Sequence, residues 1–137
     1  MMIKMHDKTK ITEISESGED YLEAIFLLYR KTGYVRCVDV ATYFGYSKPS
    51  ISHAVSILED GGYLIKGKDG NLILTELGTR VAELTYEKHC FFKTQLISAG
   101  VEQEQADREA CRMEHTVSED SFRKLKINAD KGNAYDI

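Results

Sequence analysis

The chain has 137 residues, of which 42% are hydrophobic and 29% charged, so it can form one core or a small domain with an interaction module. Its net charge of −4 argues against nucleic-acid binding by bulk charge alone. The three cysteines lack disulfide-framework spacing, the first ten residues lack the apolar run of a signal peptide, and no stretch reaches the roughly 18 apolar residues of a membrane span. We therefore expect a cytoplasmic protein with no membrane partner.

Basic side chains are concentrated in one part of the chain. Residues 30–68 carry six basic residues against three acidic ones. The basic residues are Arg30, Lys31, Arg36, Lys48, Lys66 and Lys68, and the acidic ones are Asp39, Glu59 and Asp60. A basic segment joined to an acidic remainder is compatible with nucleic-acid contact through one face.

The chain begins with a segment that has no sustained period. We expect residues 1–16 to form a flexible leader. The sequence SGED at 17–20 has the form of a helix-capping signal, and apolar residues then recur at helical spacing. This pattern predicts a first helix that is capped at Ser17 and stops at Gly33.

Two further helices follow, with a turn between them. Residues 38–44 predict a short helix, and Gly45-Tyr46-Ser47 predicts the turn. The next helix is predicted from Pro49 to Asp60 with Ser47 at its start, because proline is tolerated in a first helical turn. It is expected to end at Gly61-Gly62.

A β-hairpin is predicted next. The β-prone runs 63–66 and 71–75 flank a turn of Gly and Asp residues at 67–70. Three helices followed by a hairpin have the element order of a winged helix-turn-helix, which we predict for residues 17–75.

The remainder is predicted to be helical. Apolar residues at helical spacing indicate a long helix over 76–100 and another over 102–116, and the polar stretch 128–137 is expected to be a frayed tail. The predicted fold is therefore mainly α with a small β-hairpin, with a helical domain at 76–137.

The predicted helix from Pro49 to Asp60 is the candidate DNA reader. Short hydroxyls and a lysine near the start of such a helix suit base edges and phosphates in a major groove, and the hairpin would be the wing. The candidate DNA-binding residues are Arg36, Ser47, Lys48, Pro49, Ser50, Ser52, His53, Ser56, Lys66 and Lys68. The alternative is a small α+β protein-interaction domain with a solvated polar helix.

Three metal-ligand types coincide in the predicted helix 102–116. Cys111, Glu114 and His115 have the spacing i, i+3 and i+4, which places a thiol, a carboxylate and an imidazole on one helical face. The alternative explanations are a buried apolar Cys111 and an ordinary charged surface at Glu114 and His115.

Upstream donors add to this set. Asp20 and Glu23 are three residues apart on the predicted first helix, and His89 lies midway along the long helix. Each has an alternative explanation: Asp20 can complement the helix N-terminus, and His89 can be a packed or surface histidine.

Several landmarks together are similar to one family. They are Glu19-Asp20-Tyr21-Leu22-Glu23, Ser47-Lys48-Pro49-Ser50, the segment Leu72–Gly78, His89 eleven residues before Gly100, and Glu114-His115. From about Gly18 to Ser118 the chain resembles the diphtheria-toxin-repressor family of metal-dependent repressors, most closely its manganese-transport-regulator branch.

The resemblance implies a homodimer in which metal is held between the first helix and the dimerisation helices. Carried over position by position, the implied ligands are Asp20, Glu23, His89, Cys111, Glu114 and His115. Residues 76–137 would then be a helical metal-binding and dimerisation domain with a short tail.

The chain departs from both branches of the family. Cys111 stands where the manganese branch has glutamate, and Asp20 stands where the iron branch has methionine. Lys93 replaces a glutamate, which argues against an iron-type ancillary site, and the region after Ser118 is too short for an SH3-like domain. This hybrid set predicts Mn(II) or Fe(II) as the cellular effector, with Zn(II) or Co(II) binding in vitro.

The predicted function is a metal-dependent transcriptional repressor of metal-ion homeostasis that binds a double-stranded DNA operator as a homodimer. One alternative is a winged-helix regulator that responds to an organic ligand and has a structural or vestigial metal site. An enzyme is not predicted, because no general base is left once the ligands are assigned, and no small organic substrate is expected.

Overall fold

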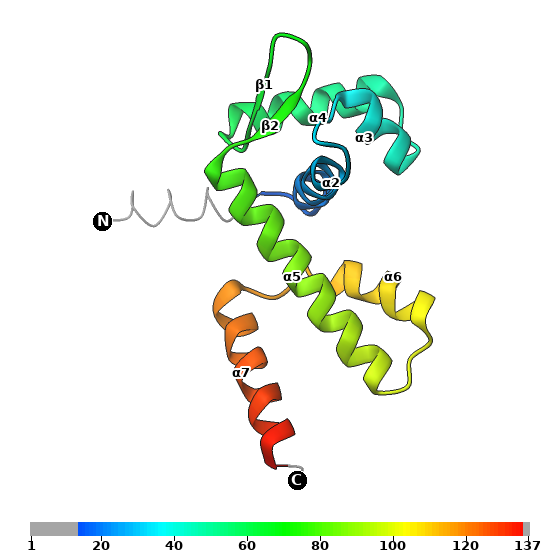
Figure 1. Ribbon diagram of the computed structural model, residues 1–137, viewed down its shortest axis with the longest axis vertical. Helices are drawn as coiled ribbons and strands as arrows, with labels where there is room; N and C mark the ends of the chain where they lie inside the picture. The colour runs from blue at the N-terminus through cyan, green and yellow to red at the C-terminus, as the bar shows by residue number, and fades with distance from the viewer. Residues whose placement is uncertain (1–13, 136–137) are drawn as a thin grey trace, which may run out of the picture. The chain divides into compact units, whose positions relative to one another are not determined.

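A computed structural model describes residues 14–135, which contain six α-helices and one two-stranded sheet (Figure 1). In chain order the elements are α2 (Glu16–Thr32), α3 (Cys37–Phe44), α4 (Lys48–Asp60), β1 (Leu64–Lys66), β2 (Leu72–Leu74), α5 (Glu76–Ser98), α6 (Gln103–Met113) and α7 (Glu119–Tyr135). Most of the expected leader, residues 1–13, lies outside the described residues. The chain forms two compact units, which divide within α5 between Glu83 and Leu84.

The start of α2 differs from the sequence-based prediction. The Ser15 hydroxyl, not that of Ser17, caps the helix by accepting a hydrogen bond from the Gly18 backbone N–H at 2.9 Å. Two serines two residues apart offer competing caps, and the predicted start at Ser17 is wrong. The predicted stop is confirmed: Gly33 has φ 77° and its N–H donates to the carbonyl of Tyr29 at 2.7 Å.

The helix-turn-helix of α3 and α4 is confirmed. Gly45 ends α3 in the left-handed conformation at φ 73°, which a residue without a Cβ adopts freely. Ser47 caps α4 by accepting from the Ser50 N–H at 3.3 Å, and Pro49 lies in the first turn. The core beneath these helices is made of buried apolar side chains from every element of the first unit, including Leu22, Ile25, Val40, Ile51, Val55, Leu58, Leu64 and Leu72.

The hairpin is also confirmed, with β1 and β2 antiparallel and Ile65 opposite Ile73. It is tied to the segment between α2 and α3. The N–H of Leu72 donates to the carbonyl of Val35 at 2.7 Å, and the N–H of Val35 donates to the Asn71 side chain at 3.1 Å. The wing therefore has a fixed place against the rest of the first unit.

The start of α5 is tightly joined to this unit. Thr75 donates its hydroxyl to the Gly62 carbonyl at 2.6 Å and accepts from the Gly78 N–H at 3.1 Å. A Cβ at Gly78 would lie 1.9 Å from the Tyr63 carbonyl oxygen, so only glycine fits this close approach. From here α5 continues into the second unit, where it carries His89.

The second unit packs the last part of α5 with α6 and α7. Its buried centre is Phe92, Ala110 and Phe122, one from each helix, and the Phe91 ring meets the Phe122 ring edge-on at 5.5 Å. This small cluster joins the three helices. Among residues 14–135, no helix combines the length and apolar character needed to cross a membrane.

The prediction of a frayed tail from residue 128 is wrong, because α7 is continuous to Tyr135. Phe122 buries this helix against α5. On its polar side Lys124 pairs with Asp120 at 3.0 Å, one helical turn away. The polar sequence of α7 therefore did not reveal a helix whose Phe122 is buried in the cluster of the second unit.

Candidate nucleic-acid interface and metal centre

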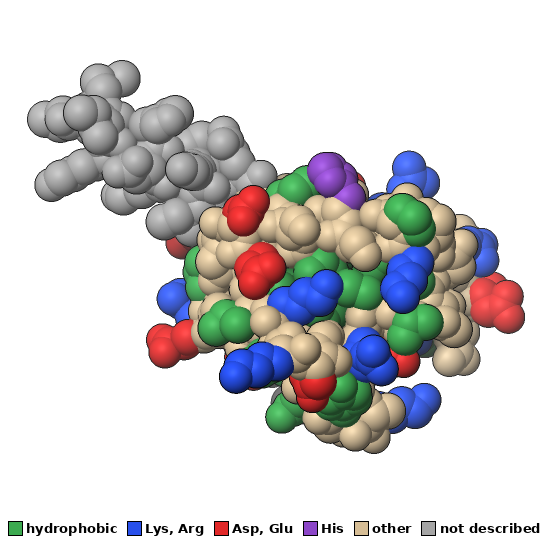
Figure 2. Space-filling view, turned by 90° about the horizontal axis from the view of Figure 1, so that it is seen from above, with side chains coloured by type: hydrophobic (Ala, Val, Ile, Leu, Met, Phe, Trp, Pro, Cys, Tyr) green, Lys and Arg blue, Asp and Glu red, His purple; other side chains and the backbone are tan. Residues whose placement is uncertain are grey.

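The ten predicted DNA-binding residues lie on the surface of the first unit. All are exposed except Ser52, which is half-buried. They come from the start of α3, the cap and first turns of α4, and the hairpin. Figure 2 shows the molecule from above, with Lys and Arg side chains distributed across the face and a histidine near its edge.

Two of these residues also form hydrogen bonds at helix starts. Ser47 uses its hydroxyl to cap α4 and to hydrogen-bond the Ser50 hydroxyl at 2.9 Å. Arg36 precedes α3, and its backbone N–H donates to the Asp39 carboxylate at 2.8 Å. The arrangement offers a helix N-terminus with hydroxyls and a lysine, which is suited to phosphate and base-edge contact.

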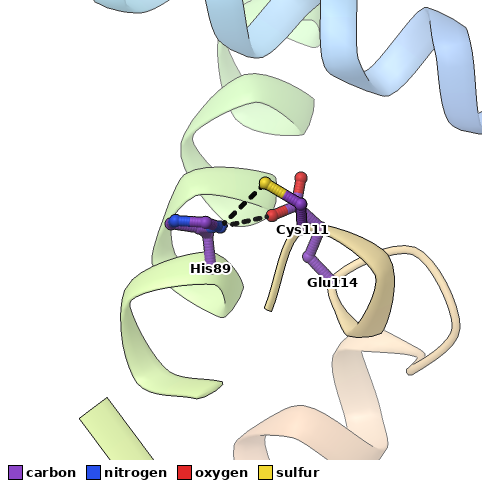
Figure 3. A group of neighbouring side chains, drawn as sticks. All are labelled: His89, Cys111 and Glu114. Carbon is purple, nitrogen blue, oxygen red and sulfur yellow. Dashed lines mark hydrogen bonds and ion pairs between the residues drawn. The ribbon is translucent and has the colours of Figure 1, made fainter. Parts of the chain in front are cut away.

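In the second unit, His89 of α5 meets Cys111 and Glu114 at the end of α6 (Figure 3). The distance from His89 Nδ1 to Glu114 Oε1 is 2.9 Å, and the distance from His89 Nδ1 to Cys111 Sγ is 3.6 Å. One ligand atom from each residue lies within 4.8 Å of the others. Such separations suit one ion, since metal–ligand bonds are about 2.0–2.5 Å long.

The end of α6 explains this placement. The helix stops at Met113, earlier than predicted, and Glu114 is its C-cap. Glu114 retains helical angles, φ −62° and ψ −22°, and its N–H donates to the Ala110 carbonyl at 3.0 Å. The three-residue spacing from Cys111 therefore still brings the two donors together, although Glu114 and His115 lie beyond the helix.

Glu114 is an unusual carboxylate. It is 1% exposed, and its Oε2 has no hydrogen-bond partner in the described part of the chain. Nε2 of the His115 side chain lies 3.5 Å from this oxygen. A buried carboxylate oxygen without a partner is costly, and a cation beside it would remove that cost. The thiol, carboxylate and imidazole donors thus fit a divalent transition-metal ion.

The sequence-based reasoning did not identify Asp107. This residue is one turn before Cys111 on α6, and its Oδ1 lies 3.0 Å from His89 Nε2. The same oxygen lies 3.1 Å from Lys93 Nζ. The four-residue spacing to Cys111 was the available signal, but it does not reveal the contact with His89, because His89 belongs to another helix.

The electrostatics favour a protonated His89 when no metal is bound. The Cys111 sulfur, the Glu114 carboxylate and the Asp107 carboxylate raise the pKa of His89 to about 11, against the opposing effect of burial. An ion that binds this nitrogen must therefore displace a proton.

Several alternatives from the sequence can now be decided. Cys111 is exposed, so its explanation as a buried apolar side chain is wrong. His89 is neither merely packed nor on an open surface, because both ring nitrogens meet carboxylates. Asp20 and Glu23 lie on α2 in the first unit, and Ser15, not Asp20, caps that helix. The acidic residues in the first turn of α2 are Glu16 and Glu19, so Asp20 lies beyond the helix N-terminus that it was expected to complement.

Two family profiles match almost the whole described chain. Residues 13–72 match the N-terminal DNA binding domain of the iron dependent repressor, and residues 75–129 match its metal binding and dimerisation domain. The chain belongs to the iron dependent repressor family. It is a metal-dependent transcriptional regulator and not an enzyme, and the mainly α winged helix-turn-helix fold is confirmed.

Individual relatives agree with this assignment. The transcriptional regulator MntR of Escherichia coli O6:H1 is 32% identical over 116 residues, which cover 85% of this chain and 75% of that protein. The structure of the manganese regulator SloR has a TM-score of 0.73 at 26% identity, covering 82% of this chain and 53% of SloR. ScaR with bound Zn2+ has a TM-score of 0.70 at 29% identity, with coverage of 82% and 53%. The chain thus spans about half the length of SloR and ScaR.

Proposed function

We propose that this regulator represses genes of metal-ion homeostasis and that Mn(II) or Fe(II) activates it for operator binding. The observation that carries the proposal is the convergence of His89 and Cys111 on the buried Glu114 carboxylate, whose Oε1 faces His89 Nδ1 and whose Oε2 has no hydrogen-bond partner in the described part of the chain. A donor set of this kind, in a chain that also has a DNA-reading unit, is suited to sensing a metal.

The proposed ligands are His89, Cys111, Glu114 and His115 from the second unit, with Asp20 and Glu23 from α2. The first four are supported by their mutual placement, and the α2 pair by the sequence resemblance at Glu19–Glu23. The bound ion would supply positive charge to the buried carboxylate. We assign residues 17–75 to DNA binding and 76–137 to metal binding and dimerisation.

The identity of the ion follows from ligand chemistry. Carboxylates and imidazole suit Mn(II), whereas the Cys111 sulfur favours Fe(II), Co(II) or Zn(II). The similar protein ScaR is a manganese-activated repressor and has also been seen with bound Zn2+, which supports a response to one ion together with binding of another. We therefore propose Mn(II) or Fe(II) as the signal in the cytoplasm and expect Zn(II) and Co(II) to bind in vitro.

The mechanism is a coupling free energy between metal and DNA binding. Because the proposed ligands are divided between α2 and the second unit, an ion held by all of them would restrain the orientation of the reader helix α4. A homodimer must present two such helices to half-sites about 34 Å apart or a multiple of that distance. Residues that hold an ion in this way would disfavour unproductive orientations of α4 and so raise operator affinity, and by linkage bound operator would tighten metal binding by the same factor.

The test is an anaerobic DNA-binding titration of the purified chain with Mn(II), Fe(II), Zn(II) or a chelator. We expect at least a tenfold increase in operator affinity with the effector, and loss of that increase with chelator. An operator affinity that ignores chelator would favour the organic-ligand alternative. Unfolding on metal removal would instead indicate a structural ion.

A further inference from the structure

Asp107 Oδ1 connects the metal centre to a lysine. It lies 3.0 Å from His89 Nε2 and 3.1 Å from Lys93 Nζ. All three residues belong to the second unit: His89 and Lys93 are one turn apart on α5, and Asp107 is on α6. Neither Lys93 nor Asp107 belongs to the proposed ligand set.

The two nitrogens of His89 face different groups. Nδ1 is directed to Glu114 Oε1 and Cys111 Sγ, at 2.9 and 3.6 Å, whereas Nε2 is directed to Asp107. A neutral imidazole has one N–H and one lone pair, and only the lone pair can bind a metal. A carboxylate that accepts from Nε2–H leaves the lone pair on Nδ1, on the side of the other donors.

Lys93 has a definable part in this arrangement. Its ammonium group binds the same oxygen of Asp107 that accepts from His89, and its side chain is 30% exposed. It therefore holds that oxygen at the ring and balances the carboxylate charge on the side away from the metal ligands. Asp107 is itself 49% exposed in its side chain, so without Lys93 it would be free to rotate toward water.

We propose that Asp107 and Lys93 are positioning residues of the metal centre: Asp107 holds His89 with Nδ1 toward Cys111 and Glu114, and Lys93 holds Asp107. The inference rests on the proposed metal site. Outer-layer carboxylates of this kind orient ligating histidines, and their loss typically lowers metal affinity by about 10–100-fold. The competing explanation is a surface ion pair that merely joins α5 to α6.

The chain offers a matched control pair. Lys124 and Asp120 on α7 form an exposed lysine–aspartate pair at 3.0 Å that touches no proposed ligand. The variants Asp107→Ala, Asp107→Asn, Lys93→Met and Lys93→Arg can therefore be compared with Asp120→Ala and Lys124→Met. Circular dichroism of each metal-free chain checks that it is folded.

Zn2+ affinity of the full chain, measured by competition with a chromophoric chelator, is the first readout. We expect a 10–100-fold loss for Asp107→Ala and a smaller loss for Lys93→Met. Lys93→Arg should retain nearly the wild-type affinity, and Asp107→Asn should retain part of it, because the amide oxygen still accepts from Nε2–H. Neither control substitution should change the affinity.

The second readout is the imidazole 15N NMR spectrum of the Zn2+-loaded protein, which a purely structural pair would not alter. The wild-type chain should show metal at Nδ1 and a hydrogen on Nε2 of His89, and Asp107→Ala should weaken or mix this pattern. Wild-type affinity and an unchanged pattern in Asp107→Ala would overturn the inference. A wild-type chain that binds no Zn2+, Mn2+ or Fe2+ would instead overturn the proposed function.

Discussion

The two units of this chain hold their functional side chains in opposite ways. In the first unit the candidate DNA-binding residues are exposed and are positioned by the backbone beneath them, through the Ser47 cap and the Val35 contacts to the wing. In the second unit the candidate ligands contact one another, and Glu114 is completely buried. The DNA-binding candidates therefore face solvent, whereas the second unit holds a buried carboxylate oxygen, Glu114 Oε2, that has no hydrogen-bond partner in the described part of the chain.

This difference predicts which substitutions will affect one function without disturbing neighbouring residues. A change on the DNA-reading surface should alter one contact to an external partner and leave the fold intact. A change at the metal centre should disturb several neighbours, because His89 alone contacts Cys111, Glu114 and Asp107.

Glu114→Ala should produce the largest change. It removes the buried carboxylate that faces both His89 and His115, so we expect metal affinity to fall by more than about 100-fold and metal-enhanced DNA binding to disappear. Binding to DNA without metal should be unchanged, because the reader surface is in the other unit. Electrophoretic mobility shifts with and without Mn(II) measure both. An intact metal response would contradict the assigned site.

Metal affinity should rise with pH. The folded metal-free chain holds the pKa of His89 at about 11, above its ordinary value of 6.5, so the ring is protonated between about pH 6 and 8. An ion that displaces this proton gains roughly tenfold in affinity per pH unit from this group alone. Isothermal titration in buffers of different ionisation enthalpy measures the proton released. A pH-independent affinity would contradict the displacement of a proton from His89.

Folding of the metal-free chain has the opposite sign of pH dependence. A pKa raised by folding stabilises the folded state fully below the ordinary value of 6.5, and this contribution is lost as pH rises through about 11. In alkaline solution the metal affinity should therefore rise with pH, while the free energy of unfolding of the metal-free chain should fall. Urea unfolding with chelator at several pH values provides the matching measurement.

Cys111→Ser should change the preference among metal ions more than it changes the overall affinity for metal. Cys111 is exposed and lies 3.6 Å from His89 Nδ1, so the smaller, harder hydroxyl should be accepted without repacking. We expect the affinity ratio of Zn(II) to Mn(II) to fall by about tenfold or more, since thiolate favours the softer ion. Competition titrations with both ions measure the ratio. An unchanged ratio would show that the sulfur does not ligate.

The predictability of the two units follows the same contrast. Local sequence signals predicted the helix ends of the first unit well. Gly33, Gly45 and Ser47 end or cap their helices through backbone hydrogen bonds to residues only a few positions away. The error at Ser17 came from two serines that both satisfy a local rule, of which Ser15 has the hydroxyl within reach of the Gly18 N–H. Local sequence was informative there because hydrogen bonds between residues close in sequence define the helix ends of this unit.

The second unit depends on contacts between distant residues. The spacing of Cys111 and Glu114 was visible in the sequence, but the partnership of His89 with Asp107 spans two helices and has no local signature. The helix α7 was missed for the same reason, since it is joined to α5 by contacts between distant residues, namely the burial of Phe122 with Phe92 and the pairing of Arg123 and Lys126 with Glu87. Only the resemblance to known repressors linked His89 to the α6 donors in advance.

Lys48→Ala should have a moderate effect confined to DNA. Lys48 is exposed in the first turn of α4, where a lysine can contact phosphate. Loss of one phosphate contact should weaken binding to all sequences several-fold and reduce the salt slope of binding by about 1. Metal affinity should not change. Operator titrations at several salt concentrations test this, and an unaltered slope would remove Lys48 from the interface.

Glu87→Gln should have the smallest effect and no functional one. The Glu87 carboxylate accepts from Arg123 at 2.8 Å and from Lys126 at 2.6 Å, which joins α5 to α7 and lowers the pKa of Glu87, chiefly through Lys126. Its side chain is 35% exposed, so solvent screening limits the loss of unfolding free energy to under about 1 kcal/mol. Urea unfolding of the metal-free chain measures the loss. A change in Zn2+ affinity would mean that α7 supports the candidate metal centre. The solvent-screened contact between α5 and α7 could then no longer be distinguished from the ligand residues that contact one another.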